Sequence, residues 1–264
     1  MTEEMLRSKE NKRTDAKLAV YYEGALMREQ AAALASHLGA FLADSRAEAE
    51  HYELQLRLDE QGLTLTGDGQ EMRGDLTHML PRLKQSNLER EILVKAARIK
   101  GAAGPLLAID ATAGMGEDSI LLAAAGYEVW LYEQDPVIAA LLSDALQRAA
   151  KIPEFTAIAE RMHLHEGDSI LAMRHLERQP DVVVLDPMFP ERQKSALVKK
   201  KFQLLHHLER PCADEEALLE AAIVAKPRKI VIKRPVKGPW LAGRKPDYTL
   251  SGKAIRYDCL TFAR

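Results

Sequence analysis

The amino-acid sequence predicts an α/β fold, in which a parallel sheet covered by helices follows a small N-terminal α+β subdomain. From residue 105 onward, short apolar runs alternate with helical segments, which is typical of parallel strands joined by crossover helices. Before them, a strand, an alanine-rich helix and two further strands follow one another. A third observation concerns the site: four successive strands of the larger domain each end in an acidic residue. The carboxyl ends of parallel strands meet at one edge of a sheet, where such sheets bind ligands.

The first part of the chain predicts a tail and the small subdomain. Residues 1–16 are highly charged, so we expect a flexible tail. Residues 17–80 hold the α+β subdomain, and a unit of this size is too small to be very stable unless it packs on the rest of the chain. Its expected elements are a strand at 18–22, a helix at 28–42, a strand at 52–58, its hairpin partner at 63–66 and a connector at 67–81.

Residues 81–264 predict the larger domain. Its first helix is expected to be capped by Ser86 or Asn87, whose side chains can accept the free N–H groups of a helix start. The expected helices are 88–99, 117–125, 136–150, 169–177 and 214–225. The expected strands are 105–110, 127–132, 163–166, 181–186, 229–233 and 254–262.

Composition indicates a soluble, cytoplasmic protein without a metal site. Hydrophobic residues make up 47% of the 264 residues, and no run is long and apolar enough to span a membrane. The start lacks the features of a signal peptide. Cys212 and Cys259 match no metal-ligand spacing. The net charge is −2 overall, but residues 187–264 carry 17 basic and 8 acidic side chains, which permits a basic face on the last third of the chain.

The loop after the strand at 105–110 predicts a nucleotide-cofactor site. The strand ends at Asp110, and the loop that follows contains Gly114 and Gly116 before a helix begins near Glu117. Glycine allows the backbone to approach a ligand closely. The loop lacks the three glycines of the dinucleotide fingerprint, and an ordinary tight turn is the alternative.

A second acid makes the cofactor interpretation more specific. Glu133 ends the next strand, 23 residues after Asp110, and an acid at this spacing can accept hydrogen bonds from both hydroxyls of a ribose. Both NAD and S-adenosylmethionine contain such a ribose. Glu117 and Asp118 stand at the helix start where a dinucleotide would place its pyrophosphate. Acids there disfavour a phosphate and suit a cationic sulfonium, although they are also ordinary helix-start residues.

Two more acids end strands further along. Asp168 could accept from the exocyclic amine of adenine, or it could cap the helix that begins at Ser169. Asp186 is followed by Pro187, which cannot continue the strand and leaves a stiff turn. This turn is expected to hold the aromatic ring of Phe189 near the carboxylate, an arrangement suited to binding a flat base. Alternatively, Phe189 could be an ordinary buried side chain.

Four segments of the chain resemble the ribosomal RNA small subunit methyltransferase J family. The resemblance is dense from about Met72 to the C-terminus and looser over 17–71. Its motifs are Asp110–Asp118, Leu131–Pro136, Asp186–Ala196 and Lys233–Pro235. Two features depart from the wider methyltransferase class. The glycine loop is sparser, and Met188-Phe189 stands where many amino-methylating enzymes have Pro-Tyr or Pro-Phe.

This resemblance implies a Rossmann-like class I methyltransferase fold with a mostly parallel, seven-stranded type of sheet and helices on both faces. It also implies S-adenosylmethionine as the cofactor and the N2 amine of a guanine in small-subunit (16S) ribosomal RNA as the methylated group. The cofactor contacts that it implies are Glu117, Asp118, Glu133, Gln134, Asp168, Ser169 and Asp186.

The chemistry of such a reaction assigns roles to the remaining candidates. An ionised Asp186 could accept the N1–H and N2–H of guanine, and Phe189 could stack on the base. The candidates for contacts with RNA phosphates are Lys194, Lys199, Lys233 and Arg234. A nicotinamide-dependent oxidoreductase and a non-catalytic RNA-binding assembly factor of the ribosomal subunit are the alternative functions.

Overall fold

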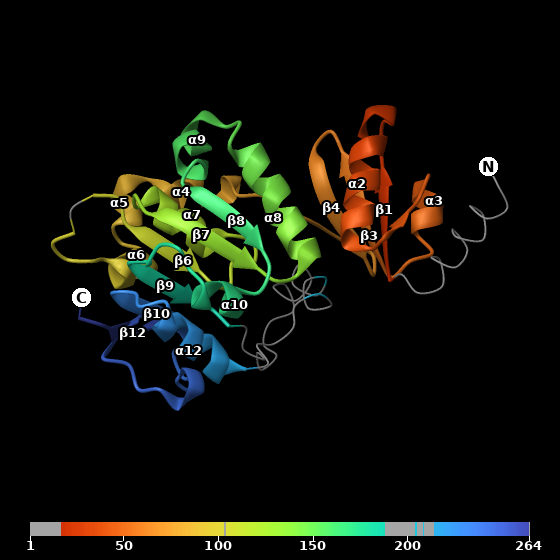
Figure 1. Ribbon diagram of the computed structural model, residues 1–264. Helices are drawn as coiled ribbons and strands as arrows, with labels where there is room; N and C mark the ends of the chain where they lie inside the picture. The colour runs from red at the N-terminus through yellow and green to blue at the C-terminus, as the bar shows by residue number, and fades with distance from the viewer. Residues whose placement is uncertain (1–16, 103, 188–203, 205–207, 209–213, 264) are drawn as a thin grey trace. The chain divides into compact units, whose positions relative to one another are not determined.

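Figure 1 shows the computed structural model of the chain, which describes residues 17–102, 104–187, 204, 208 and 214–263. The described residues form two units. The first contains residues 17–74 together with Leu204 and Leu208, and the second contains 75–187 and 214–263. The chain therefore passes from the second unit after Pro187 to the first unit at Leu204, and it is again part of the second unit at Asp214.

The first unit is a five-stranded sheet in the order β2-β1-β3-β4-β5. β1 pairs in parallel with β2 and β3, and β3, β4 and β5 form an antiparallel meander. The side chain of Leu204 is buried, and it packs beside Gly67 of this unit, since a Cβ added to Gly67 would lie 3.0 Å from Leu204 Cδ2. The elements are β1 (Leu18–Tyr22), η1 (Ala25–Met27), α2 (Arg28–Leu38), β2 (Phe41–Leu42), α3 (Arg46–Ala49), β3 (Leu54–Asp59), β4 (Gly62–Gly67) and β5 (Gln70–Arg73).

Two expectations for this unit were wrong in detail. The helix expected at 28–42 ends at Leu38, because Gly39 adopts the left-handed conformation (φ 61°) that terminates helices, and Phe41 pairs with β1. The connector expected at 67–81 contains β5, which pairs with β4. The other expected strands of the unit are confirmed, with ends that differ by at most two residues.

The second unit is a seven-stranded mixed sheet in the order β11-β12-β10-β9-β6-β7-β8. The five strands from β10 to β8 are parallel, and β12 and β11 are antiparallel additions. The expected seven-stranded, mostly parallel sheet is thereby confirmed. The strands are β6 (Leu107–Asp110), β7 (Glu128–Glu133), β8 (Met162–Glu166), β9 (Val182–Leu185), β10 (Lys229–Pro235), β11 (Tyr248–Ser251) and β12 (Ile255–Thr261).

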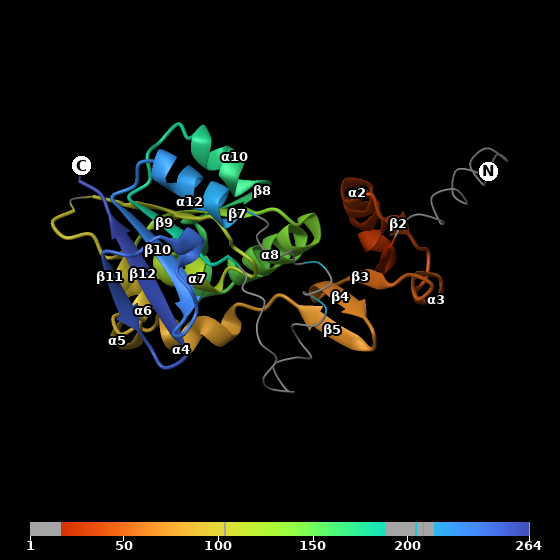
Figure 2. The same cartoon turned by 90° about the horizontal axis from the view of Figure 1, so that it is seen from below.

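Helices cover both faces of this sheet, as Figure 2 shows for α10 and α12 on one side and α4 and α6 on the other. One apolar core packs α6 to α9 against Ala108, Val129 and Val184, and the other packs α10 and α12 against Ile109 and Val183. The helices are η2 (Thr77–Met79), α4 (Leu80–Leu83), α5 (Gln85–Leu88), α6 (Ile92–Ala97), α7 (Glu117–Ala124), α8 (Pro136–Ala149), α9 (Pro153–Ala159), α10 (Ser169–Arg174), α12 (Glu215–Val224) and η3 (Leu241–Gly243). Within the described ranges, no helix is long and apolar enough to cross a membrane.

The elements of this unit differ from the expected ones in several places. The helix expected at 88–99 is two short helices, α5 and α6, and the predicted caps Ser86 and Asn87 lie inside α5. The exposed edge strand β11 and the helices α4 and α9 were not predicted. These three elements are short, so their periodicity gives little signal.

Candidate active site

Three predicted acids lie together at one edge of the second unit. Asp110, Glu133 and Asp186 stand at the carboxyl ends of β6, β7 and β9, which are neighbouring parallel strands. Asp186 follows the last residue of β9 directly. The common strand direction brings these residues of distant sequence to the same edge, where a ligand can contact all of them.

Asp110 organises the glycine loop. It is only 2% exposed, its Oδ2 accepts a hydrogen bond from Ser119 Oγ at 2.6 Å, and its Oδ1 accepts from the backbone N–H of Thr112 at 3.2 Å. Burial raises the pKa of Asp110 to about 7, although the Ser119 bond favours the ionised form. The carboxylate therefore joins the loop to the start of α7, and it has a structural role in addition to any cofactor contact.

Glu133 also holds the loop. Its Oε2 accepts from the N–H of Gly114 at 2.9 Å, and its Oε1 accepts from the N–H of Asp135 at 2.9 Å. Burial raises the pKa of Glu133, and the backbone donors oppose that shift. Each carboxylate oxygen has a second lone pair. Both oxygens can therefore still accept a ribose hydroxyl while they fix Gly114.

A lysine lies between two of the acids. Lys233 Nζ is 2.8 Å from Asp118 Oδ2 and 2.9 Å from Asp186 Oδ2. The two carboxylates raise the pKa of Lys233 against the effect of burial, so its ammonium stays charged. Lys233 was predicted to contact RNA phosphate. In the structure it neutralises one of the two carboxylates and links β10 to α7 and to the end of β9.

Asp186 is fixed through its backbone and remains accessible through its side chain. Its N–H donates to Thr112 Oγ1 at 2.7 Å, and its side chain is 40% exposed. Burial raises the pKa of the Asp186 carboxyl, and the Lys233 ammonium opposes that rise. A half-buried carboxylate held on a rigid strand end can still accept hydrogen bonds from a ligand at a defined position.

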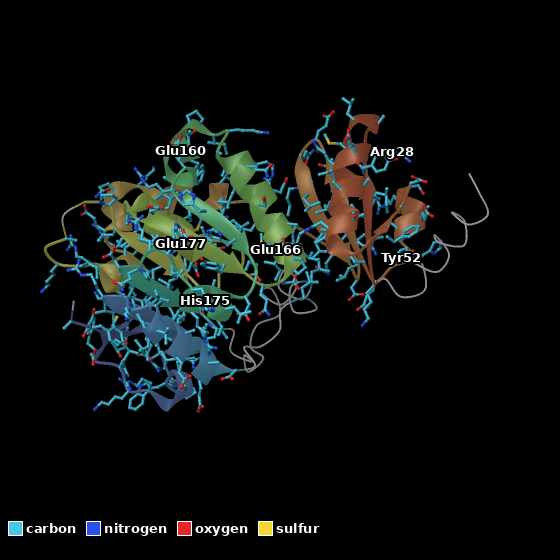
Figure 3. All side chains as sticks on the ribbon, in the orientation of Figure 1. Arg28, Tyr52, Glu160, Glu166, His175 and Glu177 are labelled. Atoms are coloured by element: carbon cyan, nitrogen blue, oxygen red, sulfur yellow. The ribbon has the colours of Figure 1, made fainter. Side chains whose placement is uncertain are left out.

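The other predicted site residues vary in their placement. Asp168 caps α10, because its Oδ1 accepts from the N–H of Ile170 at 2.8 Å. Ser169 is buried, and Gln134 is exposed beside Glu133. Figure 3 labels Glu166 at the carboxyl end of β8, and α10 begins three residues later at Ser169, which places this helix start at the same edge. The cofactor contacts of Asp168, Ser169 and Gln134 stay predictions.

Arg234 does not face solvent. Its side chain is 0% exposed, and its Nη2 donates to Glu215 Oε1 at 2.9 Å. The position of Arg234 gives no support for the predicted contact with RNA phosphate, since the guanidinium is enclosed and paired. Three further predicted residues, Phe189, Lys194 and Lys199, lie outside the described residues.

The structure also places residues at the site that the sequence analysis missed. Ser119 donates a hydrogen bond to Asp110, and Thr112 accepts one from the N–H of Asp186. His78 Nε2 lies 3.2 Å from Glu117 Oε1. Beside the end of β7, the Tyr132 ring stacks on His165 with centroids 4.9 Å apart. Ser119 and Thr112 could have been found from their positions within the glycine loop and first turn; His78 is too distant in sequence to give a signal.

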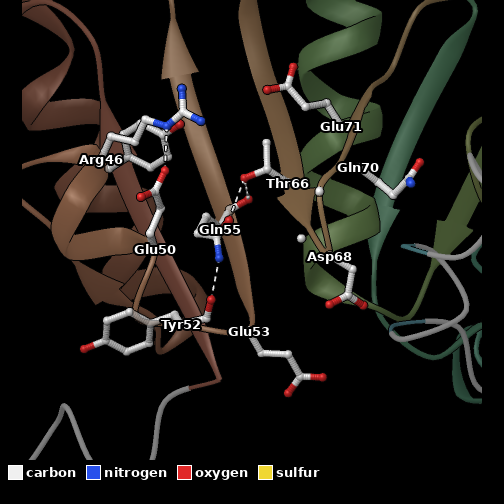
Figure 4. Close-up of a pocket in the computed structure, with 12 residues that line it drawn as sticks. Arg46, Glu50, Tyr52, Glu53, Gln55, Thr66, Asp68, Gln70 and Glu71 are labelled. Atoms are coloured by element: carbon white, nitrogen blue, oxygen red, sulfur yellow. Dashed lines mark hydrogen bonds and ion pairs between the residues drawn. The ribbon is translucent and has the colours of Figure 1, made fainter.

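The first unit contains a separate hollow of about 450 Å³, shown in Figure 4. Four acids, Glu50, Glu53, Asp68 and Glu71, line it with a single basic residue, Arg46, which pairs with Glu50 at 2.9 Å. This balance of charge disfavours a phosphate-bearing ligand there. In the described parts of the chain, no group of three or more His, Cys, Asp and Glu residues is arranged to hold a metal ion.

Comparison with known proteins identifies the family. The model of the SAM-dependent methyltransferase family SAM_MT matches residues 44–261. Ribosomal RNA small subunit methyltransferase J from Thioalkalivibrio sulfidiphilus is 39% identical over 254 residues, which cover 93% of this chain and 98% of that protein. The chain belongs to the ribosomal RNA small subunit methyltransferase J family. The J protein of Dechloromonas aromatica is 44% identical, over 71% of this chain and 75% of its own length.

A solved structure supports the same assignment of fold. The crystal structure of a SAM-dependent methyltransferase from Neisseria gonorrhoeae matches with a TM-score of 0.72 and 28% identity, over 92% of this chain and 95% of that one. The chain therefore has the Rossmann-like class I methyltransferase fold that the sequence predicted, and it is a methyltransferase that uses S-adenosylmethionine. The expectation of this cofactor is confirmed, and it excludes the nicotinamide alternative.

The residues at the sheet edge fit this cofactor. A Cβ added to Gly114 would meet no atom within 4 Å, so the loop backbone is open to a ligand. Glu133 can accept from ribose hydroxyls. Asp118, Asp186 and Lys233 together carry one net negative charge when all are ionised, which suits a sulfonium and disfavours a pyrophosphate.

Alanine substitutions of the two loop glycines should have different effects. Gly116→Ala should lower the unfolding free energy by about 1–3 kcal/mol, because φ is +77° and the new Cβ would lie 2.8 Å from Leu142 Cδ1. At Gly114, with φ +52° and open space, the same change should cost about 1–2 kcal/mol and mainly weaken cofactor binding. Thermal unfolding and calorimetric titration with S-adenosylmethionine test this. If Gly114→Ala and Gly116→Ala were equally stable and lost the same affinity for S-adenosylmethionine, the assignment of Gly114 to the cofactor site would be contradicted.

Proposed function

We propose that this protein transfers a methyl group from S-adenosylmethionine to the exocyclic N2 of a guanine in small-subunit (16S) ribosomal RNA. The observation that carries the proposal is the half-buried carboxylate of Asp186, fixed at a strand end 2.9 Å from Lys233 Nζ and joined through Thr112 to the cofactor loop. The names of the relatives support small-subunit ribosomal RNA as the substrate class.

Asp186 supplies the acceptor that the chemistry needs. The lone pair of an exocyclic amine is delocalised into the base, so the nitrogen is a poor nucleophile. The two oxygens of an ionised Asp186 can accept the N1–H and the N2–H of guanine, which returns electron density to N2. Adenine has no N1–H, so the same pair of acceptors favours guanine. Lys233 uses one lone pair of Oδ2 and leaves Oδ1 and the second lone pair of Oδ2 for the base.

The reaction itself is a direct displacement. When bound, S-adenosylmethionine supplies a methyl group on a positively charged sulfur, which leaves as the new N–C bond forms. N2 gains positive charge in this step and releases its proton toward Asp186 or water. The other site residues act by orientation: the glycine loop and Glu133 fix the cofactor, and Asp186 fixes the amine. Such alignment can contribute roughly 7–11 kcal/mol of barrier lowering.

Three predicted contacts outside the described residues complete the proposal. Phe189 follows Asp186 by three positions and is proposed to stack on the target base. Lys194 and Lys199 are proposed to contact RNA phosphates.

The test is methylation of RNA that lacks the modification. Small-subunit ribosomal RNA from a strain lacking this gene is incubated with the protein and labelled S-adenosylmethionine, and the nucleosides are analysed by mass spectrometry. We expect label in N2-methylguanosine only. Label in another nucleoside would contradict the guanine N2 assignment, and RNA binding without any label would favour a non-catalytic assembly factor.

A further inference from the structure

The strand that carries Lys233 continues into an exposed basic turn. β10 ends at Pro235, at the same edge of the sheet as Asp186, because β10 and β9 are parallel neighbours. Residues 236–255 contain four basic side chains and one acid. All four basic residues are exposed: Lys237, Arg244, Lys245 and Lys253. The acid, Asp247, accepts two hydrogen bonds from Thr261.

An exposed tryptophan lies within this turn. Trp240 is 44% exposed, while its neighbour Leu241 is 1% exposed and packs in the core beside α12. A large aromatic side chain costs free energy to leave in water, since burying such a residue is normally stabilising. Among the described residues, Trp240 is the largest of the exposed apolar side chains. The basic turn therefore presents an indole ring that packing within the protein only partly buries.

The turn is held rigid by a buried arginine. Arg256 Nη1 donates to the carbonyl oxygens of Pro235, Val236 and Gly238 at 2.7–2.9 Å, and its side chain pairs with Asp258 at 2.9 Å. Three backbone carbonyls bonded to one guanidinium fix the backbone on the N-terminal side of Trp240. Loops that bind ligands on a rigid scaffold are built in this way.

A second clamp holds the other side of Trp240. Glu215 Oε2 accepts from the N–H of Ala242 at 3.1 Å, and Glu215 Oε1 accepts from Arg234. Ala242 has φ +47°, a left-handed conformation that is costly for a residue with a Cβ. Strain of this kind persists where the surrounding contacts enforce it, and it clusters at functional sites. The buried Arg234 thus connects the end of β10 to the turn through Glu215.

The neighbouring hairpin adds to the same surface. The N–H of Val236 donates to the carbonyl of Ala254 at 3.1 Å, so the exposed residues Lys237 and Lys253 adjoin the two ends of this bond. Two exposed lysines in the same segment as an exposed aromatic residue with a fixed backbone match the phosphates and the unstacked base of a single-stranded nucleic acid. A duplex would offer the phosphates but no free base face.

Resting on the proposed function, we propose that Trp240, Lys237 and Lys253 form a binding surface for an unpaired segment of the RNA substrate, with a base stacked on Trp240 and phosphates contacted by the two lysines. The surface would hold RNA that flanks the target guanine, since its first residue, Lys237, follows Lys233 of the site by four positions. It is separate from the position proposed for the target base at Asp186.

The fluorescence of Trp240 provides a direct test. The chain has two tryptophans, so Trp130→Phe leaves Trp240 as the sole tryptophan. We expect titration with an unpaired RNA oligonucleotide to quench this fluorescence, and a duplex of the same sequence to quench it far less. Anisotropy of labelled RNA gives the binding curve independently. RNA that binds without quenching, or RNA that does not bind, would overturn the proposal.

Substitutions then separate stacking from charge. Trp240→Ala should weaken binding of unpaired RNA about tenfold, and Trp240→Phe should recover most of that loss. Lys237→Ala with Lys253→Ala should reduce the dependence of log Kd on log salt by about 1–2 in slope. Lys151→Ala is the matched control, because this exposed lysine follows α8, which runs back toward the opposite edge of the sheet. Equal effects of the control and the double variant would contradict the surface.

Methylation assays on the same proteins distinguish the two proposals. If wild-type protein methylates no RNA but Trp240 is quenched by it, the proposed function fails and the surface stands. If the wild-type protein methylates RNA and Trp240→Ala leaves the methylation rate nearly unchanged both for bare RNA and for assembled subunits, the proposed binding surface is wrong. A Trp240→Ala defect confined to assembled subunits would assign the contact to a ribosomal protein, and it would also overturn the RNA surface.

Discussion

Asp186→Asn is expected to lower kcat for RNA methylation by about 10²–10⁴-fold, the range typical of a lost proton acceptor. The amide keeps the shape of the carboxylate and one carbonyl oxygen, which can still accept from Lys233. Its NH₂ group presents donors where the carboxylate presented an acceptor, so one N–H of the base faces another N–H. The substitution therefore removes the interaction that localises the lone pair on N2.

The control measurements separate this effect from loss of structure. The midpoint of thermal unfolding should change little, because Asp186 is 40% exposed and its backbone bond to Thr112 remains. The affinity for S-adenosylmethionine should change by about tenfold at most. Asp144→Asn on α8 is a matched control, since it removes an acid that pairs with Arg148 one turn along the same helix. A variant at Asp186 with wild-type kcat would remove this residue from the mechanism.

Lys233→Met should have the second large effect, on both stability and pH dependence. It leaves the carboxylates of Asp118 and Asp186 without the ammonium that lies within 2.9 Å of each. We expect a loss of about 1–3 kcal/mol in the free energy of unfolding, since hydrogen bonds to charged groups contribute amounts of this order. Urea unfolding at pH 7 measures it, with Lys151→Met as the surface control.

The pH dependence follows from the balance at Asp186. Burial raises the pKa of this carboxyl and Lys233 opposes the rise, so removal of Lys233 should raise the pKa further. The acceptor works only when ionised, and its activity is lost as the pH falls through that pKa. The acidic limb of kcat/KM against pH should therefore move to higher pH by about one unit or more in Lys233→Met. Lys233→Arg should restore most of the original profile; an unchanged profile in the methionine variant would contradict the role of Lys233.

The sheet of the larger domain could be predicted because its signals are strong. Buried parallel strands are continuous apolar runs, and each of the five expected between 105 and 233 is present with small changes at the ends. The short elements gave no comparable signal. β5 and β11 contain polar residues on exposed faces, and the division of 88–99 into α5 and α6 depends on tertiary packing of Leu88 and Leu93 rather than on local preference.

The acidic residues of the candidate site could be predicted more readily than the ion pairs that they form. Asp110, Glu133 and Asp186 were predicted directly, because each follows or ends an expected strand. The pairing of Lys233 with Asp186 depends on register, because Ile232 aligns with Leu185 and the next residues are therefore neighbours. Aligning the two strands in sequence would have revealed this pair. The burial of Arg234 could not be foreseen, since a basic residue beside Lys233 has the same sequence signal whether it faces RNA or Glu215.

The central claim is that this protein methylates guanine N2 of small-subunit ribosomal RNA with Asp186 as the acceptor. The most direct measurement is the N2-methylguanosine content of that RNA in cells that lack the gene, complemented with wild-type or Asp186→Asn protein at matched levels. We predict that deletion lowers the content, that the wild-type gene restores it, and that Asp186→Asn does not. Unchanged N2-methylguanosine after deletion, or full restoration by Asp186→Asn, would contradict the claim.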